Sequence, residues 1–270
     1  MKLGKYKITT RKQKQRLAIV IGAGVLILLV VIAMIGLMIC GCLYLHEHLS
    51  ADSDAGLAAA AAAITDGDAA ADSSGSDAAE PDACVILDPG HGGSDGGTIG
   101  LLDGQEIIEK EIAFTVTQKV RTILENNNIE VLLTHDEDTD LGLKARTAFA
   151  NETGADRFVS IHCNAYEEDR SICGMECYYE KDEAASQALA EAIFQQAEDS
   201  GRIATRDLRT DMMYVVRFTD MPATLVELGY LSNTAECRKL ADSSYQDLLA
   251  QTIADGILQD LGLGRKKTEA

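Results

Sequence analysis

The feature that most constrains this chain is an uninterrupted apolar run close to its start. No charged residue occurs from Leu17 to Leu45. As an α-helix rising about 1.5 Å per residue, this run would be about 43 Å long, which exceeds the roughly 30 Å hydrocarbon core of a bilayer. A helix buried in a globular core would carry a polar face, and a cleaved signal peptide has an apolar run of only about 7–15 residues. We therefore predict a transmembrane anchor over residues 17–45.

The charges before this run predict its orientation. Residues 1–16 contain seven Lys or Arg residues and no Asp or Glu. Such basic flanks stay in the cytoplasm, so we expect a basic cytoplasmic tail, a single pass through the cell membrane, and the rest of the chain on the outer, cell-wall side. The stretch from Ile39 to Cys42 loosely resembles a bacterial lipoprotein cleavage site, and lipid attachment to Cys42 is left open.

The segment after the apolar run is acidic and poor in residues that a core could bury. Residues 46–82 contain nine Asp or Glu residues and no Lys or Arg, among many alanines, serines and glycines. Such a composition cannot offset the entropy lost on ordering, so we predict a disordered acidic linker. The whole chain has 24 Lys and Arg residues against 43 Asp and Glu, a net charge of −19. This balance argues against a nucleic-acid partner, which would need clustered basic residues.

Beyond residue 82 the hydrophobic pattern alternates between short apolar runs and helical periodicity. We expect helices at 108–124, 143–151, 184–200 and 242–261, and strands at 84–88, 129–134, 157–162, 175–179, 212–216 and 223–227. Strands separated by helices of this length are typical of a mostly parallel sheet. The sequence therefore predicts a single α/β domain over residues 83–262, with about six strands flanked by helices, and a short tail over residues 263–270.

Several polar residues follow the ends of these expected strands, where parallel sheets gather their ligands. His91 follows the first strand, His162 ends the third and Glu227 ends the last, while Glu109 begins a helix. Two imidazoles, a carboxylate and a further Glu would suit a catalytic zinc with an open position for water and a base beside it. The spacing alone is unlike the compact HExxH motif, so a hydrogen-bonding role for each His and a helix-dipole role for Glu109 stay open.

Two other nucleophiles compete with this interpretation. Ser94 lies within a G-x-S-x-G sequence, but a nucleophile elbow needs a strand directly before it and a helix directly after it. Cys163, beside His162, could act as a thiol nucleophile, although a cysteine at a strand end is usually part of the core. The glycine-rich stretch around Ser94 has no Lys for a phosphate-binding loop. We expect Cys173 and Cys177 to be free thiols, because strand geometry would separate them.

Four ordered blocks between residues 84 and 262 resemble the zinc-dependent N-acetylmuramoyl-L-alanine amidases of bacterial cell walls. The blocks are VILDPGHGGSDGG, Glu109-Lys110, SIHCNA and PATLVELGYLSN. The resemblance implies that His91, Glu109 and His162 bind Zn²⁺ and that Glu227 is the catalytic general acid and base. It also implies a mixed sheet of about six strands and a peptidoglycan substrate, cut between the muramic acid lactyl group and the L-Ala of the stem peptide.

The departures from the family pattern are small. His135 stands where the family often has Arg, and Cys163 where a small residue is usual. Some members carry a long inhibitory helix after the fourth strand, but residues 180–183 leave no room for one. We therefore expect no obligatory activator. The alternative from another class is a membrane-tethered peptidoglycan-binding or scaffold protein that has lost catalysis.

Overall fold

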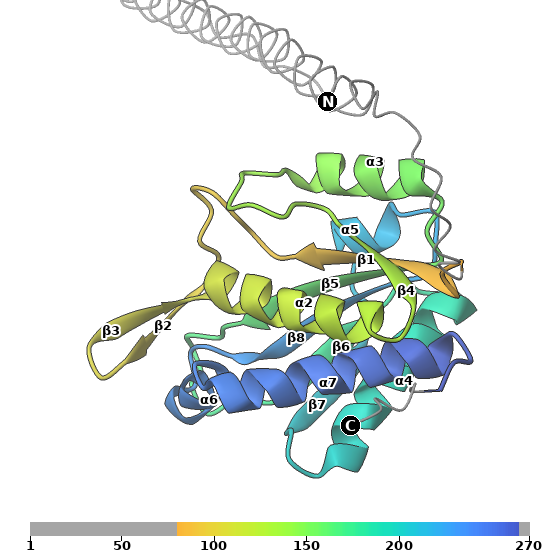
Figure 1. Cartoon of the computed structure of the whole chain (residues 1–270). Coiled ribbons are helices and arrows are strands. Elements are labelled where there is room, and N and C mark those ends of the chain that lie inside the picture. The colour runs from red at the N-terminus through yellow and green to blue at the C-terminus, as the bar shows by residue number, and fades with distance from the viewer. Residues whose placement is uncertain (1–79, 265–270) are drawn as a thin grey trace, which may run out of the picture. The chain divides into compact units, whose positions relative to one another are not determined.

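The computed structural model describes residues 80–264 and centres on a six-stranded sheet of order β4-β1-β5-β8-β6-β7 (Figure 1). β4, β1, β5 and β8 run parallel, β6 is antiparallel to β8, and β7 is parallel to β6. The predicted α/β domain with a mixed sheet is confirmed. The strands are β1 (Ala83–Pro89), β4 (Ile129–Leu133), β5 (Arg157–Asn164), β6 (Met175–Tyr178), β7 (Thr205–Arg209) and β8 (Ala223–Tyr230).

Helices cover both faces of this sheet, because neighbouring residues of its strands point to opposite sides. Leu87 and Val159 pack into a core with the helices α2, α4 and α7, while Ile86 and Phe158 pack into a second core with α3 and α5. Figure 1 shows α3 and α5 on one side of the sheet and α2, α4 and α7 on the other. The helices are α2 (Glu109–Glu125), α3 (Leu143–Thr153), α4 (Ala184–Ser200), α5 (Tyr214–Arg217) and α7 (Ser243–Asp260).

One predicted strand is wrong. Residues 212–216 do not form a strand, because Tyr214–Arg217 is the short helix α5, and the edge strand is instead β7 at Thr205–Arg209. The two adjacent valines at 215 and 216 are both 3% exposed in this helical turn. β7 is a mostly polar edge strand, which has little apolar periodicity to reveal it.

Three further elements have no counterpart in the sequence prediction. β2 (Ile99–Leu102) and β3 (Gln105–Ile108) form an antiparallel hairpin between β1 and α2, and α6 (Thr234–Leu240) follows β8. In Figure 1 the hairpin extends away from the sheet. The sequence prediction missed this hairpin, although its two-residue Asp103-Gly104 turn, with φ values of 51° and 84°, is of the kind that favours a hairpin. The hairpin leads directly into Glu109, the first residue of α2.

The predicted tail at 1–16, the anchor at 17–45 and nearly all of the linker at 46–82 lie outside the described residues. Within residues 80–264 there is no helix with the length and hydrophobicity needed to cross a bilayer. In the same part of the chain Cys173 and Cys177 are free thiols, as predicted. β6 and α4 are joined by residues 179–183 alone, also as predicted.

Candidate active site

The candidate site lies along the face of the sheet that α3 and α5 cover only in part. On β5, Phe158 packs in the core under these helices, and His162 points to the same face because it is four residues further along. Glu227 on β8 is paired directly with His162 in the sheet register. The two side chains predicted from strand ends are therefore neighbours on one face, near the carboxyl ends of parallel strands.

The structure brings together the three residues that the sequence suggests as metal ligands. His91, Glu109 and His162 each offer one ligand atom, and these atoms all lie within 4.8 Å of one another. They come from the loop after β1, the first residue of α2 and the end of β5. No residue of this group is near another in sequence, so only the folded sheet creates the cluster.

Glu109 contacts both histidines of this cluster. Its Oε1 lies 3.0 Å from His91 Nε2 and 2.9 Å from His162 Nδ1. The backbone N–H groups of Cys163 and Thr98 donate to its two oxygens at 3.0 and 2.7 Å. Burial by itself would raise the pKa of Glu109, but the hydrogen bonds from His162 and His91 outweigh it and hold that pKa well below its usual range. Glu109 is therefore an ionised, oriented carboxylate.

His91 is held with its Nε2 atom toward Glu109. Its Nδ1 lies 2.8 Å from Asp95 Oδ2, and its backbone has a φ of 65°, a left-handed conformation that is uncommon outside glycine. The hydrogen bond with Glu109 raises the pKa of His91 to about 9, against an opposing effect of burial and with a further contribution from Asp95. Asp95 was not singled out by the sequence, although it lies within the glycine-rich block.

Two glycines are needed to leave space for the cluster. A Cβ on Gly90 would lie 2.4 Å from the imidazole of His162, and a Cβ on Gly97 would lie 2.5 Å from Glu109 Oε2. Gly97 also has a φ of 70°, which favours glycine. The glycine-rich loop therefore serves close packing of the ligands, which is a role that the sequence pattern did not indicate.

A buried arginine holds the loop that carries His91. Arg146 on α3 donates to Asp88 Oδ1, to the carbonyls of Pro89 and His91, and to the carbonyl of Leu141, at 2.6–2.8 Å. Arg146 is 4% exposed and Asp88 is fully buried. A guanidinium presents a rigid fork of donors, so one side chain can satisfy several acceptors at once. No role for this arginine could be predicted from the sequence, because its partners come from distant positions.

Glu227 differs from the other acidic residues of the site. Its Oε2 is, within residues 80–264, the one buried side-chain oxygen or nitrogen without a hydrogen-bond partner. Burial raises the pKa of Glu227 to about 7, partly opposed by His162 and reinforced by Glu109 and Glu176. A buried carboxyl oxygen without a partner is costly, which makes a functional role a reasonable explanation for it.

The two competing nucleophiles lack the surroundings they would need. Ser94 Oγ donates to Asp140 at 2.8 Å, and the residue lies in a turn between β1 and the hairpin rather than at a strand-to-helix elbow. Cys163 is 2% exposed, and burial raises the pKa of its thiol well above the ordinary value, so the reactive thiolate is disfavoured. Neither residue supports an alternative hydrolase mechanism.

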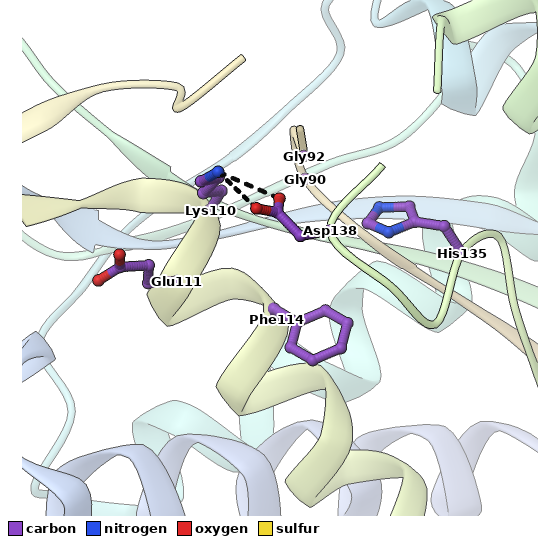
Figure 2. A pocket seen from close by; sticks show the side chains of 7 residues that line it. All are labelled: Gly90, Gly92, Lys110, Glu111, Phe114, His135 and Asp138. Atoms are coloured by element: carbon purple, nitrogen blue, oxygen red, sulfur yellow. Dashed lines mark hydrogen bonds and ion pairs between the residues drawn. The ribbon is translucent and has the colours of Figure 1, made fainter. Parts of the chain in front are cut away.

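Two cavities lie on either side of the His91 loop. One, of about 140 Å³, is lined by residues that include His91, His162 and Arg146. The other, of about 220 Å³, contains Phe114 and His135 on its wall, as Figure 2 shows. His135 lies 3.0 Å from the Pro89 carbonyl through Nε2 and stacks on Phe114. His135, which stands where the family often has Arg, therefore holds the loop that carries His91 at its Pro89 end.

The residues present fit a divalent zinc ion. Two imidazoles and one carboxylate form a donor set that occurs in catalytic zinc sites, where a fourth position stays open for water. Two of the three ligands are oriented by a further group, His91 by Asp95 and Glu109 by backbone N–H groups, which is also typical of metal sites.

Comparison with known proteins agrees with this geometry. A model of the N-acetylmuramoyl-L-alanine amidase family matches residues 85–259. N-acetylmuramoyl-L-alanine amidase LytC of Bacillus subtilis is 35% identical over 176 residues, which cover 64% of this chain but only 34% of LytC. The uncharacterized protein YqiI of Bacillus subtilis is 34% identical over 184 residues, which cover 67% of this chain and 86% of YqiI.

A solved structure shows the same relationship in three dimensions. The catalytic domain of CwlV, an N-acetylmuramoyl-L-alanine amidase from Bacillus (Paenibacillus) polymyxa var. colistinus, superimposes with a TM-score of 0.63 at 37% identity. The match covers 67% of this chain and 99% of that domain. The resemblance seen in the four sequence blocks is confirmed, and the chain belongs to the N-acetylmuramoyl-L-alanine amidase family.

Proposed function

We propose that this protein is a zinc-dependent N-acetylmuramoyl-L-alanine amidase that hydrolyses the amide between the muramic acid lactyl group and L-Ala in peptidoglycan. The observation that carries the proposal is the convergence of His91, Glu109 and His162 beside the unpartnered carboxyl oxygen of Glu227. Family membership supplies the substrate class, and the side chains supply a site suited to amide hydrolysis.

His91 Nε2, Glu109 Oε1 and His162 Nδ1 are the atoms that would hold the ion. When bound, zinc polarises a carbonyl and lowers the pKa of water from 15.7 towards about 7. Asp95 accepts a hydrogen bond from the N–H at His91 Nδ1, which leaves Nε2 available as a ligand. Glu109 has its other oxygen occupied by Thr98 N–H, so its orientation is set before any ion binds.

Glu227 is proposed to move the proton that hydrolysis requires. Its Oε2 would accept a proton from the attacking water and then donate it to the departing L-Ala nitrogen. This role needs an oxygen that is not engaged elsewhere, and Oε2 has no partner among the described residues.

We propose further that residues 17–45 anchor the protein in the cell membrane, with the N-terminus cytoplasmic and the catalytic domain on the cell-wall side. The support is the charge-free apolar run after a basic segment. We also propose that no activator is obligatory. The support is the short connection between β6 and α4, which holds no additional helix.

The test is incubation of the detergent-solubilised full-length protein with purified peptidoglycan, with and without a zinc chelator. Release of stem peptides that the chelator abolishes supports the proposal. Release that resists the chelator would point to another hydrolase, and binding without release would point to a scaffold protein.

Two substitutions separate the roles within the site. Glu227→Gln should retain zinc by elemental analysis but lower turnover by about 10²–10⁴-fold, the usual contribution of one acid–base group. His91→Ala should instead lose the metal. Near-normal hydrolysis by Glu227→Gln would refute its assignment as the proton carrier.

A further inference from the structure

A second polar cluster begins directly beside Glu227. In the register of the antiparallel pair β8 and β6, Glu176 is the partner of Glu227. His162, Glu227 and Glu176 therefore form one row across three neighbouring strands, with their side chains on the same face. Glu176 is fully buried. The row leads from the candidate metal ligands towards the edge of the sheet at β7.

Two arginines of β7 complete this row. Glu176 Oε1 lies 3.2 Å from Arg206 Nε and 3.5 Å from Arg209 Nη1. The hydroxyls of Tyr178 and Tyr230 donate to Glu176 Oε2 at 3.0 and 2.8 Å. The guanidinium of Arg206 lies over the Tyr230 ring at 5.9 Å, and that of Arg209 over the Tyr178 ring at 5.4 Å. Both arginines are thus held in defined positions.

A β-bulge explains how both arginines reach the same face. Met175 pairs with Thr205, but the next residue, Glu176, pairs with Asp207, so Arg206 is the extra residue of β7. In a regular strand, residues three apart would point to opposite faces, and a bulge changes this alternation. Gly174, with a φ of 109°, allows the close approach, because a Cβ there would lie 3.1 Å from Arg206 Cβ.

The two guanidiniums retain capacity to bind an anion. Their side chains are 40% and 42% exposed, so each guanidinium reaches solvent while it also contacts the buried Glu176. Arg209 Nη2 also lies 3.2 Å from Asp211, whereas among the described residues Arg206 is paired through Nε alone. Asp169, in the loop before β6, and Asp207, which follows Arg206 and pairs with Glu176 in the sheet register, are the other nearby acidic residues. The two terminal nitrogens of Arg206 therefore remain for a further acceptor.

From this arrangement we infer that Arg206, assisted by Arg209, binds a carboxylate of the peptidoglycan stem peptide. The inference rests on the proposed amidase function, because it places the peptide side of the scissile bond along the row from Glu227 to β7. The chemistry selects a carboxylate, since a guanidinium fork matches its two oxygens. The second stem residue meets this requirement when it is D-glutamate, and fails when its α-carboxyl is amidated as D-isoglutamine.

The experiment compares two muramyl pentapeptides that differ only in this α-carboxylate or α-carboxamide. The full-length wild type should cleave the carboxylate form with a KM about tenfold lower, a modest value because the arginines are half exposed. Arg206→Gln should raise the KM for the carboxylate form to that of the amidated form and leave kcat unchanged. Arg202→Gln, which removes the same charge from an exposed position before β7, is the matched control and should behave as wild type.

The outcomes distinguish failure of the subsite from failure of the proposed function. If wild type releases neither peptide, the amidase proposal itself is refuted, and the subsite with it. If wild type cleaves both forms with equal KM, or if Arg206→Gln weakens both forms equally, the carboxylate subsite alone is refuted. An unfolding temperature of Arg206→Gln within about two degrees of wild type would show that a KM change does not arise from loss of the fold. A lower unfolding temperature, together with a lower kcat for both forms, would instead assign Arg206 a structural role.

Discussion

The buried pair of Arg146 and Asp88 offers a sharp test of how the loop that carries His91 is held. Arg146→Met keeps most of the side-chain volume but removes all donors to Asp88, Pro89, His91 and Leu141. Asp88 would keep only neutral donors, the hydroxyls of Thr134 and Ser160 at 2.6 and 2.7 Å. A fully buried carboxylate would then lack its cation, and three carbonyls would lose a donor.

The expected loss of stability is large for a single substitution. Breaking a buried ion pair by removing one partner typically costs about 3–5 kcal/mol. Domains of this kind unfold at a total cost of about 5–15 kcal/mol. Arg146→Met should therefore remove about a fifth or more of the free energy of unfolding. Arg146→Lys should be intermediate, because an ammonium keeps the charge without the planar fork.

The assay is urea unfolding of the detergent-solubilised full-length chain, with zinc content measured in parallel. Arg121→Met is the matched control, since Arg121 forms a half-exposed pair with Glu125 on α2, and such pairs contribute about 0.3–0.5 kcal/mol. We expect Arg146→Met to lose both stability and bound zinc, and Arg121→Met to lose neither appreciably. A free energy of unfolding for Arg146→Met within about 1 kcal/mol of wild type would show that the loop does not depend on the hydrogen bonds of Arg146.

Three further outcomes follow from the site. Gly90→Ala should lose bound zinc, because its Cβ would overlap His162, whereas Gly142→Ala meets nothing within 4 Å and should retain it by elemental analysis. Asp95→Ala should weaken zinc binding by about 10–100-fold in a competition titration, and unchanged affinity would exclude its orienting role. Iodoacetamide should label exposed Cys173 in the folded protein but not buried Cys163, as peptide mass spectrometry would show.

The sequence predicted the elements that have strong apolar periodicity. The central strands and the helices near 108–124, 184–200 and 242–261 agree with the structure within a few residues, because buried strands and amphipathic helices have distinct repeats. β7 and α5 were misassigned, since an edge strand needs few apolar residues and a single helical turn can bury two adjacent valines. The hairpin of β2 and β3 was missed because each of its strands has only four residues, although the Asp103-Gly104 turn between them is a hairpin signal.

The candidate ligands were also found before the fold was known, because polar residues at the ends of buried strands stand out against their apolar neighbours. The sequence could not show that His91, Glu109 and His162 meet, as their approach depends on strand order and on the hairpin that starts α2. Nor could it assign Gly90, Asp95 or Arg146, whose roles are contacts with residues distant in sequence.

The sequence by itself determined the alternation of strands and helices, the acidic character of the chain and the identities of the polar residues at the strand ends. Tertiary structure alone decided which of those residues became neighbours. The row from His162 through Glu227 and Glu176 to Arg206 exists because β6 enters the sheet antiparallel beside β8 and because β7 carries a bulge. Register and bulges arise from pairing between strands, so no local pattern of residues specifies them.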